Sequence, residues 1–304
     1  MIRIGLVDLD TSHPQAFTTI LKQASGVQVV ALCDHHDVWP DGYDRDFARN
    51  NGITAVLRTP GEMLPLIDAA MVHGVNWDRH IERALPFIRA AMPVLIDKPV
   101  VGTLRDCFRL VSLRAQYGGI IFGGSSLRFA EEVTALKSRL ATAGPVTSVT
   151  ASGPGDFFSY GIHTTEMAQA IVGTGAMEVE FLGGDTQPCI AVLYGGGTRL
   201  QLRLGQPAQD WTLSVQTASG EEYTAHVNPA KLYPPFLRAF LAAVRGESRL
   251  DTMTPALEAV KIHLAADLAR RSGKRISLAR IPDDAAFDGA AFTADYAAAK
   301  RKNP

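Results

Sequence analysis

The sequence contains few cysteines and no cluster of them. Its three cysteines are Cys33, Cys107 and Cys189, and no two of them form a C-x-x-C pair. A zinc or redox centre built on cysteine is therefore not indicated. Widely separated thiols suit a reducing compartment, so we expect a cytoplasmic protein.

An excess of charge of one sign and a long apolar run are also missing. The chain has 30 Lys and Arg against 31 Asp and Glu, so we expect no nucleic-acid partner. An alternating apolar pattern starts at Ile2 without the basic region or cleavage site of an export signal. No segment predicts a transmembrane span, and we expect no membrane partner. At 304 residues the chain can form two domains without disulfides or a structural metal.

The first 122 residues alternate short β-rich runs with segments of helical spacing. The predicted strands are 2–7, 27–33, 55–57, 69–72, 93–96 and 119–122, and the predicted helices are 14–23, 78–91 and 103–117. Regular alternation of strand and helix is typical of βαβ units. We predict an α/β fold, with a Rossmann-like, doubly wound parallel sheet over residues 1–122.

Residues 123–304 have a different pattern. After a predicted helix at 130–140, longer β-rich runs at 146–152, 177–182, 190–204, 211–217 and 223–227 are joined by Gly-rich turns. Such turns suit hairpins, so this part predicts an α+β domain with a largely antiparallel, open-faced sheet. Two helices, 235–245 and 255–271, and a helical tail are expected to follow.

The loop after the first predicted strand lacks the glycines of a dinucleotide-binding turn. Where G-x-G-x-x-G has glycine, the chain has Asp8, Asp10 and His13. Two carboxylates there predict repulsion of a pyrophosphate, although Thr11 and Ser12 can cap a helix whose N-terminus favours an anion. Asp10, Thr11 and Ser12 could equally serve only as a helix cap.

Other residues of the first domain are placed to contact a cofactor. Asp34 ends the second predicted strand, where an acidic residue commonly accepts hydrogen bonds from the ribose diol, which favours NAD over NADP. His35 and His36, which follow it, are predicted to be surface-loop residues. Our candidate cofactor-binding residues are Asp10, Thr11, Ser12, His13, Asp34, Asn76 and Lys98.

Lys98 and His163 are the candidate catalytic residues. Lys98 follows the apolar run Val94–Ile96 and precedes Pro99, which places it at the carboxyl end of a buried strand. A desolvated lysine there can take a lowered pKa and transfer a proton, although it could also be a surface residue paired with Asp97. His163 and Glu166 are three residues apart on a predicted helix that follows a Gly-rich, aromatic loop suited to a pocket.

Several motifs resemble those of the Gfo/Idh/MocA family, named for glucose-fructose oxidoreductase, inositol dehydrogenase and a rhizopine catabolism protein. Asp97-Lys98-Pro99 resembles the E-K-P signature of this family, with Asp for Glu. Gly161-Ile162-His163 is similar to the end of its D-x-G-x-H motif, with Ser159 in place of the aspartate. Asn76–His80 resembles the loop after strand four, and 255–276 resembles the closing helical segment. The likeness covers about residues 1–281.

This resemblance implies an NAD- or NADP-dependent oxidoreductase that acts on a sugar, polyol or related carbohydrate-like substrate. Lys98 and His163 would handle the hydroxyl proton during hydride transfer. Ser159 cannot replace a carboxylate as a base, so Glu166, Asp156 and Tyr160 are candidates to compensate. Together with Arg128, which could instead form an interdomain salt bridge, these three residues are also our candidate substrate-binding residues. The resemblance further implies a homo-oligomer, a dimer or tetramer, for which Val192, Leu200, Leu202 and Leu204 could form an interface.

Two alternatives remain open at this point. The same pocket could catalyse a redox-neutral lyase, isomerase or hydrolase reaction on a keto-sugar, with a divalent metal near His163 and Glu166. Two ligands are too few to predict a metal site, and we predict none. The protein could also be a non-catalytic binding protein, but such a protein has no need of both Lys98 and His163.

Overall fold

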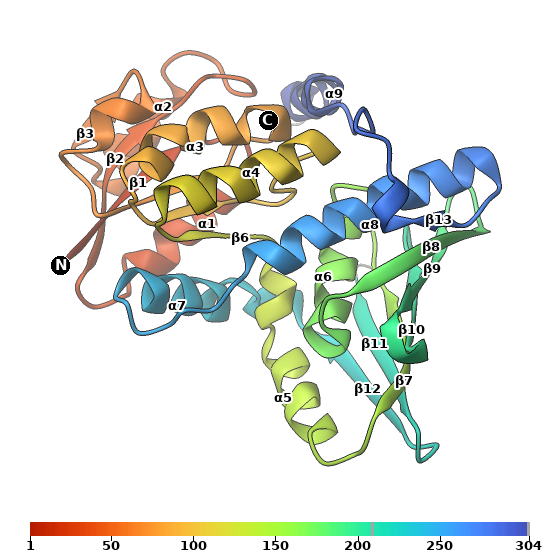
Figure 1. The fold of residues 1–304 in the computed structure, drawn as a ribbon. Helices are drawn as coiled ribbons and strands as arrows, with labels where there is room; N and C mark the ends of the chain where they lie inside the picture. Colours follow the sequence, from red (N-terminus) through yellow and green to blue (C-terminus); the bar gives the residue numbers. More distant parts are fainter. Residues whose placement is uncertain (208–209, 303–304) are drawn as a thin grey trace.

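The computed structural model describes residues 1–207 and 210–302, which form two β-sheets with helices packed against them (Figure 1). The first sheet has the strand order β3-β2-β1-β4-β5-β6. Its strands are β1 (Ile2–Val7), β2 (Val27–Cys33), β3 (Ala55–Leu57), β4 (Ala69–Val72), β5 (Val94–Ile96) and β6 (Ile121–Gly123), and all neighbours pair in parallel. This is the predicted Rossmann-like sheet, and its strand order reverses between β1 and β4.

Helices cover both faces of this sheet, which explains why its strands are apolar runs rather than alternating ones. One face packs against α3 (His80–Arg89) and α4 (Leu104–Tyr117). The other packs against α1 (His13–Leu21), α2 (Tyr43–Asn51) and α7 (Tyr233–Val244). Phe236 and Phe240 of α7 share a core with Phe17 of α1, so a C-terminal helix completes the N-terminal domain.

The second sheet has the order β12-β11-β7-β10-β9-β8-β13. Its strands are β7 (Val146–Ser152), β8 (Ala176–Gly183), β9 (Cys189–Tyr194), β10 (Arg199–Arg203), β11 (Trp211–Thr217), β12 (Glu222–Val227) and β13 (Ile276–Ser277). β7 and β10 pair in parallel and the other recorded pairs are antiparallel, which agrees with the predicted, largely antiparallel sheet.

One face of the second sheet packs against α5 (Glu131–Leu140), α6 (Gly161–Val172) and α8 (Met253–Ser272). The other face carries polar side chains such as Ser148, Gln201 and Gln216. The residues suggested above for an oligomer interface, Val192, Leu200, Leu202 and Leu204, are each 0% exposed within the single chain. They are core residues, because their side of each strand faces the helices, and that suggestion was wrong.

The run 190–204 forms a hairpin of two antiparallel strands, β9 and β10, and the Gly-rich turn Gly195–Gly197 joins them as predicted, with a φ of 81° at Gly196. One helix of the first domain differs from the prediction. α2 was not predicted, because in YDRDFARNN only Phe47 and Ala48 are buried and no apolar period appears. The helical tail is α9 (Gly289–Lys302), which lies over the N-terminal domain (Figure 1).

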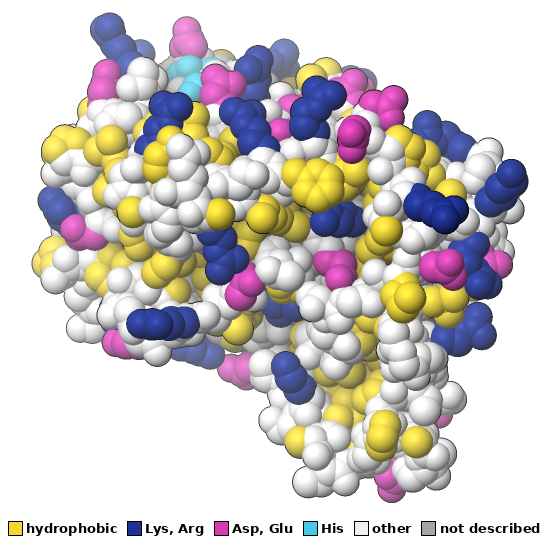
Figure 2. Space-filling model, in the orientation of Figure 1, with side chains coloured by type: hydrophobic (Ala, Val, Ile, Leu, Met, Phe, Trp, Pro, Cys, Tyr) yellow, Lys and Arg dark blue, Asp and Glu magenta, His cyan; other side chains and the backbone are white. Residues whose placement is uncertain are grey.

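The molecular surface is mixed in charge. On the face shown in Figure 2, basic and acidic side chains are interspersed, and no large area of one sign is visible. Among the described residues, no helix has the length and apolar character needed to cross a bilayer.

Candidate active site

Loops at the carboxyl ends of β1, β4 and β5 enclose a small pocket with a volume of about 130 Å³. Several candidate residues from the sequence meet there. The lining consists of Thr11, Ser12, His13, Gly74, Val75, Trp77, Asp97, Lys98, Pro99, Ser159, Tyr160, Phe292 and Tyr296. The pocket lies where the strand order of the first sheet reverses, which is where open α/β sheets bind ligands.

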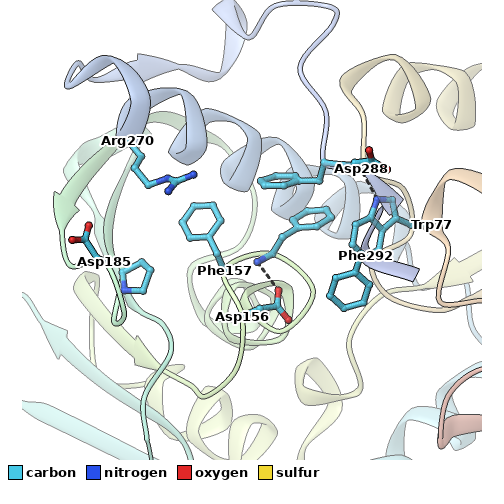
Figure 3. A pocket seen from close by; sticks show the side chains of 10 residues that line it. Trp77, Asp156, Phe157, Asp185, Arg270, Asp288 and Phe292 are labelled. Atoms are coloured by element: carbon cyan, nitrogen blue, oxygen red, sulfur yellow. Dashed lines mark hydrogen bonds between the residues drawn. The ribbon is translucent and has the colours of Figure 1, made fainter. Parts of the chain in front are cut away.

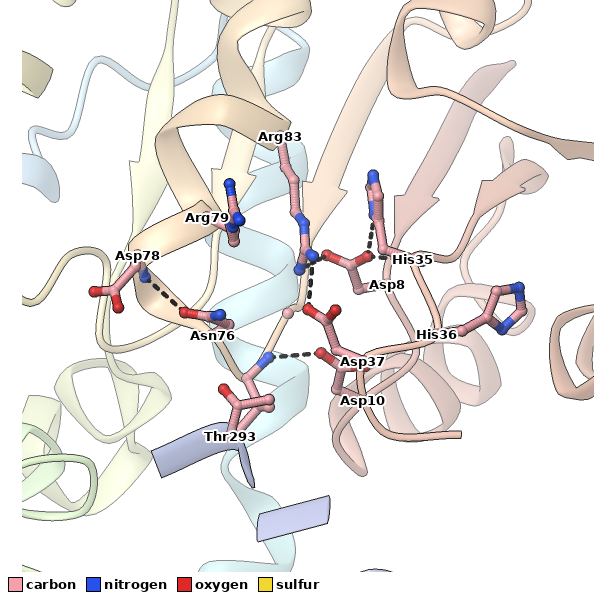
Figure 4. A network of polar contacts seen from close by, with 12 residues as sticks. Asp8, Asp10, His35, His36, Asp37, Asn76, Asp78, Arg79, Arg83 and Thr293 are labelled. Carbon is pink, nitrogen blue, oxygen red and sulfur yellow. Dashed lines mark hydrogen bonds and ion pairs between the residues drawn. The ribbon is translucent and has the colours of Figure 1, made fainter. Parts of the chain in front are cut away.

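Asp8, which stands at the first glycine position, is buried and paired. It adopts the left-handed φ of 66° that usually favours glycine, and its side chain is 1% exposed. Its carboxylate accepts from Arg83 Nη1 at 2.8 Å and lies 2.6 Å from His35 Nδ1 (Figure 4). Arg83 also bonds Asp37 at 2.6 Å. His35 is therefore a partner of Asp8 and not the plain loop residue that the sequence suggested.

Asp10, at the second glycine position, is also buried. One carboxylate oxygen accepts the Val75 N–H at 2.9 Å, while Oδ1 has no partner in the described part of the chain. Burial, followed by the charges of Asp8, Asp34 and Asp37, raises the pKa of Asp10 to about 7. Because Asp8 is paired and Asp10 is partly protonated near neutral pH, the repulsion expected from these two residues is reduced.

His13, at the third glycine position, is oriented by a buried carboxylate. Its Nδ1 lies 2.5 Å from Asp97 Oδ2, and its ring stacks on Phe17 at a centroid distance of 5.3 Å. His73 Nδ1 lies 3.2 Å from the same oxygen. Burial opposes charge on Asp97, but His13 and His73 together hold the pKa of this carboxyl well below its usual range. Asp97 thus serves the two histidines and is not a side-chain partner of Lys98.

The remaining candidate residues of the first domain lie at the same carboxyl edge of the first sheet. Thr11 Oγ1 accepts the His13 N–H at 3.2 Å, whereas Ser12 makes no side-chain capping bond to α1. Asn76 Oδ1 accepts the Asp78 N–H at 3.2 Å and caps the short helix η2 (Trp77–Arg79). Asp34 Oδ1 accepts the Leu9 N–H at 3.3 Å, and its Oδ2 lies 3.5 Å from His36 Nδ1.

Lys98 and His163 both lie against Tyr160. Lys98 is half-buried, and its Nζ donates to the Ser159 carbonyl at 3.2 Å and lies 5.1 Å from the centre of the Tyr160 ring. His163 belongs to the first turn of α6 in the second domain, and its ring centre lies 5.8 Å from that of Tyr160. The two candidate catalytic residues therefore come from different domains and meet at one aromatic side chain.

Burial shifts the pKa values of this pair toward the neutral forms. Desolvation lowers the pKa of Lys98, although Asp97 opposes the shift. Desolvation and the charge of Lys98 lower the pKa of His163 well below its usual range. His163 Nδ1 also lies 2.6 Å from Ser125 Oγ, which fixes the orientation of the ring. Such shifts are typical of groups that transfer protons.

Arg128 and Glu166 form an ion pair, and Arg128 lines a hollow other than the Lys98 pocket. Arg128 Nε bonds Glu166 at 3.3 Å, and Arg128 Nη2 bonds Gln169 at 3.0 Å. Burial raises the pKa of Glu166, although Arg128 opposes the shift. Arg128 and Gln169 line a separate hollow of about 460 Å³, which shares no lining residue with the Lys98 pocket.

Asp156 lines a second pocket next to the Lys98 pocket. Its Oδ1 accepts the N–H groups of Phe158 and Ser159 at 2.9 and 2.5 Å, which shapes the loop before α6. This pocket measures about 320 Å³ and shares Trp77 and Phe292 with the Lys98 pocket. Its wall combines aromatic rings with charged side chains, Asp156, Asp185, Arg270 and Asp288 among them (Figure 3).

Sequence reasoning missed several residues that build the site. Arg83, His73 and Ser125 carry no motif, and only their contacts with Asp8, Asp97 and His163 show what they do. Trp77 was part of a quoted motif, but Phe292 and Tyr296 of α9 gave no signal of their own. In residues 1–207 and 210–302, no group of three or more His, Cys, Asp or Glu side chains is arranged to hold a metal ion.

Comparison with known proteins identifies the first domain. The family model GFO_IDH_MocA, described as an oxidoreductase family with an NAD-binding Rossmann fold, matches residues 2–125. This match to residues 2–125 agrees with the resemblance predicted from the motifs, and the N-terminal sheet belongs to an NAD-binding Rossmann domain.

Individual relatives agree with this assignment. YceM of Salmonella typhimurium, named as an oxidoreductase, is 29% identical over 147 residues, which are 47% of this chain and 44% of YceM. The chain thus matches less than half of the length of this relative.

Solved structures match over both domains. A Thermotoga maritima protein described as a dehydrogenase is 17% identical, with 92% of this chain and 100% of that chain covered and a TM-score of 0.80. A Lactobacillus casei myo-inositol dehydrogenase, solved with NAD(H) and myo-inositol, is 16% identical, with 91% and 96% covered and a TM-score of 0.79. At these identities the likeness shows a shared two-domain fold.

The residues of this edge fit the dinucleotide that the Gfo/Idh/MocA fold implies. Asp34 Oδ2 accepts no hydrogen bond from the residues described, and a ribose hydroxyl could supply one. The N-terminus of α1 offers positive potential for phosphate, and the charge of Asp8 is already balanced by Arg83. The volume of the pocket fits a dinucleotide less well than its side chains do. Ligand sites measure roughly 300–1,000 Å³, whereas the pocket at Lys98 measures about 130 Å³.

Proposed function

We propose that the protein is an NAD(P)-dependent dehydrogenase or reductase of a sugar, polyol or related carbohydrate-like substrate. The observation that carries this proposal is the meeting of Lys98 and His163 at Tyr160, beside the Rossmann edge, with burial favouring the neutral form of both. A bound nicotinamide would supply the hydride acceptor or donor. Asp34 favours NAD over NADP at the adenosine end.

The contacts of Lys98 and His163 suggest different roles for them. Ser125 Oγ accepts the Leu127 N–H at 3.1 Å and can give its own proton to His163 Nδ1 at 2.6 Å. The ring proton of His163 then lies on Nε2, which can donate a hydrogen bond to a substrate oxygen. Lys98, whose Nζ donates to the Ser159 carbonyl and whose pKa is lowered by burial, is the base that takes the proton of the reacting hydroxyl.

The aromatic pocket next to Lys98 supports a carbohydrate-like substrate. Rings such as Phe157 and Trp77 offer flat apolar faces for the C–H groups of a sugar or cyclitol, and Asp156 and Arg270 offer partners for its hydroxyls. The bound myo-inositol of the Lactobacillus casei relative has this chemistry. We therefore place the substrate class among cyclic polyols and sugars.

A screen of turnover tests the proposal. Cyclitols, aldoses and sugar acids would be offered with NAD⁺ and with NADP⁺, and reduction of the cofactor would be followed at 340 nm. We expect turnover with at least one compound and a fall of about 10²–10⁴-fold in kcat for Lys98→Met. Lys274→Met, at an exposed lysine, is the matched control and should keep full activity. Equal activity of Lys98→Met and wild-type protein would refute the proposed mechanism.

A further inference from the structure

Helix α9 lies across the crevice that the cofactor of this fold would enter. Its start is fixed to the loop after β4, where Asp78 Oδ2 accepts the N–H groups of Gly289 and Ala290 at 2.9 and 3.1 Å. Trp77 Nε1 donates to the Phe287 carbonyl at 2.9 Å just before the helix. A C-terminal segment is thus attached directly to the switch point of the first sheet.

The side chains of α9 reach into the cofactor edge. Phe292 and Tyr296 line the Lys98 pocket together with Thr11, Ser12 and His13. Burial, and then the charges of Tyr160, Asp10 and Asp97, raise the pKa of Tyr296 to about 12. In Figure 4, Thr293 stands with Asp10 and Asn76 in one polar cluster. One turn further on, Ala297 packs with Val38 and Val75, from the loops after β2 and β4.

A dinucleotide bound to this fold has to pass through the same space. In doubly wound sheets it lies outside the carboxyl ends of the strands, across the point where their order reverses, here between β1 and β4. α9 spans the loops on both sides of that point. With α9 in place the pocket at Lys98 is too small for a nicotinamide and its ribose to enter with the rest of the cofactor.

The attachment of α9 is narrow. The buried residues of this 14-residue helix are Gly289, Thr293 and Ala297, which lie on one stripe. Val38, Val75 and Ala297 form a small cluster separate from the two large cores, and the partly buried Phe292 is the residue of α9 recorded against a large core, so release of α9 would uncover little of either core. By contrast, the segment before it is held by backbone bonds from Leu104 to Ala285 and from Phe287 to Gly102. The pivot therefore lies at Asp288 and Gly289.

We propose that α9 is a strap that competes with the dinucleotide for the crevice, and that Asp78 is its latch. The inference rests on the proposed use of NAD(P) and adds a regulatory step to it. In the closed state Phe292 and Tyr296 fill the crevice, and the cofactor binds only to molecules in which the strap has swung out. The apparent affinity for the cofactor is then reduced by the fraction of molecules in the open state.

Two variants open the strap by different means. Asp78→Ala removes the oxygen that accepts the first two N–H groups of α9. A Cβ at Gly289 would stand 2.8 Å from Asn76 Oδ1 and 2.9 Å from Trp77 Cδ1, so Gly289→Val wedges the strap away from the loop. Glu82→Ala is the matched control, because Glu82 is an exposed acidic residue near Asp78 whose partner is Arg79 and not α9.

The test is a titration of the full-length proteins with NADH, followed by nicotinamide fluorescence, with hydrogen–deuterium exchange over residues 289–302. If the strap is open in about a tenth of the wild-type molecules, both variants should bind NADH roughly tenfold more tightly, and Glu82→Ala should match wild type. NADH should also speed exchange in the α9 of wild-type protein.

Contrary outcomes separate this inference from the proposed function. Equal NADH affinity in wild type and both variants, with α9 exchanging freely in the variants, would overturn the strap and leave the dehydrogenase standing. Protection of α9 by NADH would also overturn it, because the helix would then belong to the bound state. No NADH binding by any of the proteins, although α9 is released, would overturn the strap and the proposed cofactor together.

Discussion

Two regions at the same edge of the Rossmann sheet differ in whether their buried ionisable groups have close partners of opposite charge. At the ends of β1 and β5, buried carboxylates have close partners: Arg83 and His35 for Asp8, and His13 and His73 for Asp97. At the domain junction, burial of Lys98 and His163 is not compensated in this way, and it shifts the pKa of each toward its neutral form. The first region is thus stabilised in its charged state, while the second is prepared to exchange protons.

The sharpest test of this contrast replaces Lys98 by a residue that keeps the charge. Lys98→Arg should lower kcat by about 10²–10⁴-fold, because a guanidinium cannot lose its proton and so cannot act as the base. NADH affinity should change little. Steady-state kinetics and a binding titration measure the two effects, and an Arg variant with near wild-type kcat would mean that charge alone is required.

Breaking the paired region should instead affect stability. Arg83→Met leaves Asp8 buried without its main partner and should lower the free energy of unfolding by about 3–5 kcal/mol in a urea titration. Asp8→Gly in the same chain removes the stranded carboxylate, suits the φ of 66°, and should restore most of the loss. A loss below about 1 kcal/mol for Arg83→Met would mean that this buried ion pair stabilises the protein no more than an exposed pair does.

Asp10 is the exception within the paired region, and pH should reveal it. Its pKa is raised from 3.8 to about 7, so between these values the folded state holds a proton that the unfolded state releases. Folded Asp10 therefore costs stability increasingly as pH rises through this window, by as much as roughly 4 kcal/mol. Asp10→Asn should raise the thermal midpoint at pH 8 and much less at pH 5. An equal gain at both values would contradict the raised pKa.

The smallest expected effect concerns the orientation of His163. Ser125→Ala removes the hydroxyl beside His163 Nδ1 and should lower kcat about tenfold, because the ring can then adopt the other tautomer. Affinity for NADH should stay unchanged, which separates this effect from a general loss of structure. Ser125→Thr, which keeps a hydroxyl, should recover activity; failure to do so in a stably folded variant would count against a role for the hydrogen bond.

Local pattern predicted most of the fold. β1 to β6 were expected within one or two residues of their observed bounds, because strands buried on both faces are short apolar runs. α2 was missed because a helix with two buried residues has no apolar period. The parallel pairing of β7 with β10 depends on a crossover that no local pattern encodes. The division of the chain at residue 122 stays a prediction, although α7 and α9 return to the first sheet.

Sequence context and resemblance together singled out Lys98 and His163, whose catalytic role stays a prediction. The structure places both against Tyr160. The neutralisation of Asp8 depends on Arg83, 75 residues away, and the position of α9 depends on a contact between Asp78 and Gly289 across 211 residues. Such pairs are set by tertiary packing and cannot be read from local sequence. The sequence analysis therefore overestimated the negative charge that Asp8 and Asp10 would present to a pyrophosphate.

The most direct test of the central claim is a titration of wild-type protein with NADH and NADPH at pH 6, where Asp10 is largely protonated. Nicotinamide fluorescence and thermal midpoint would be followed together. We predict saturable binding with NADH preferred, weaker binding at pH 8, and unchanged binding by Lys98→Met protein that has lost turnover. No saturable change with either cofactor up to millimolar concentration, in wild type and in Asp78→Ala protein, would contradict the account.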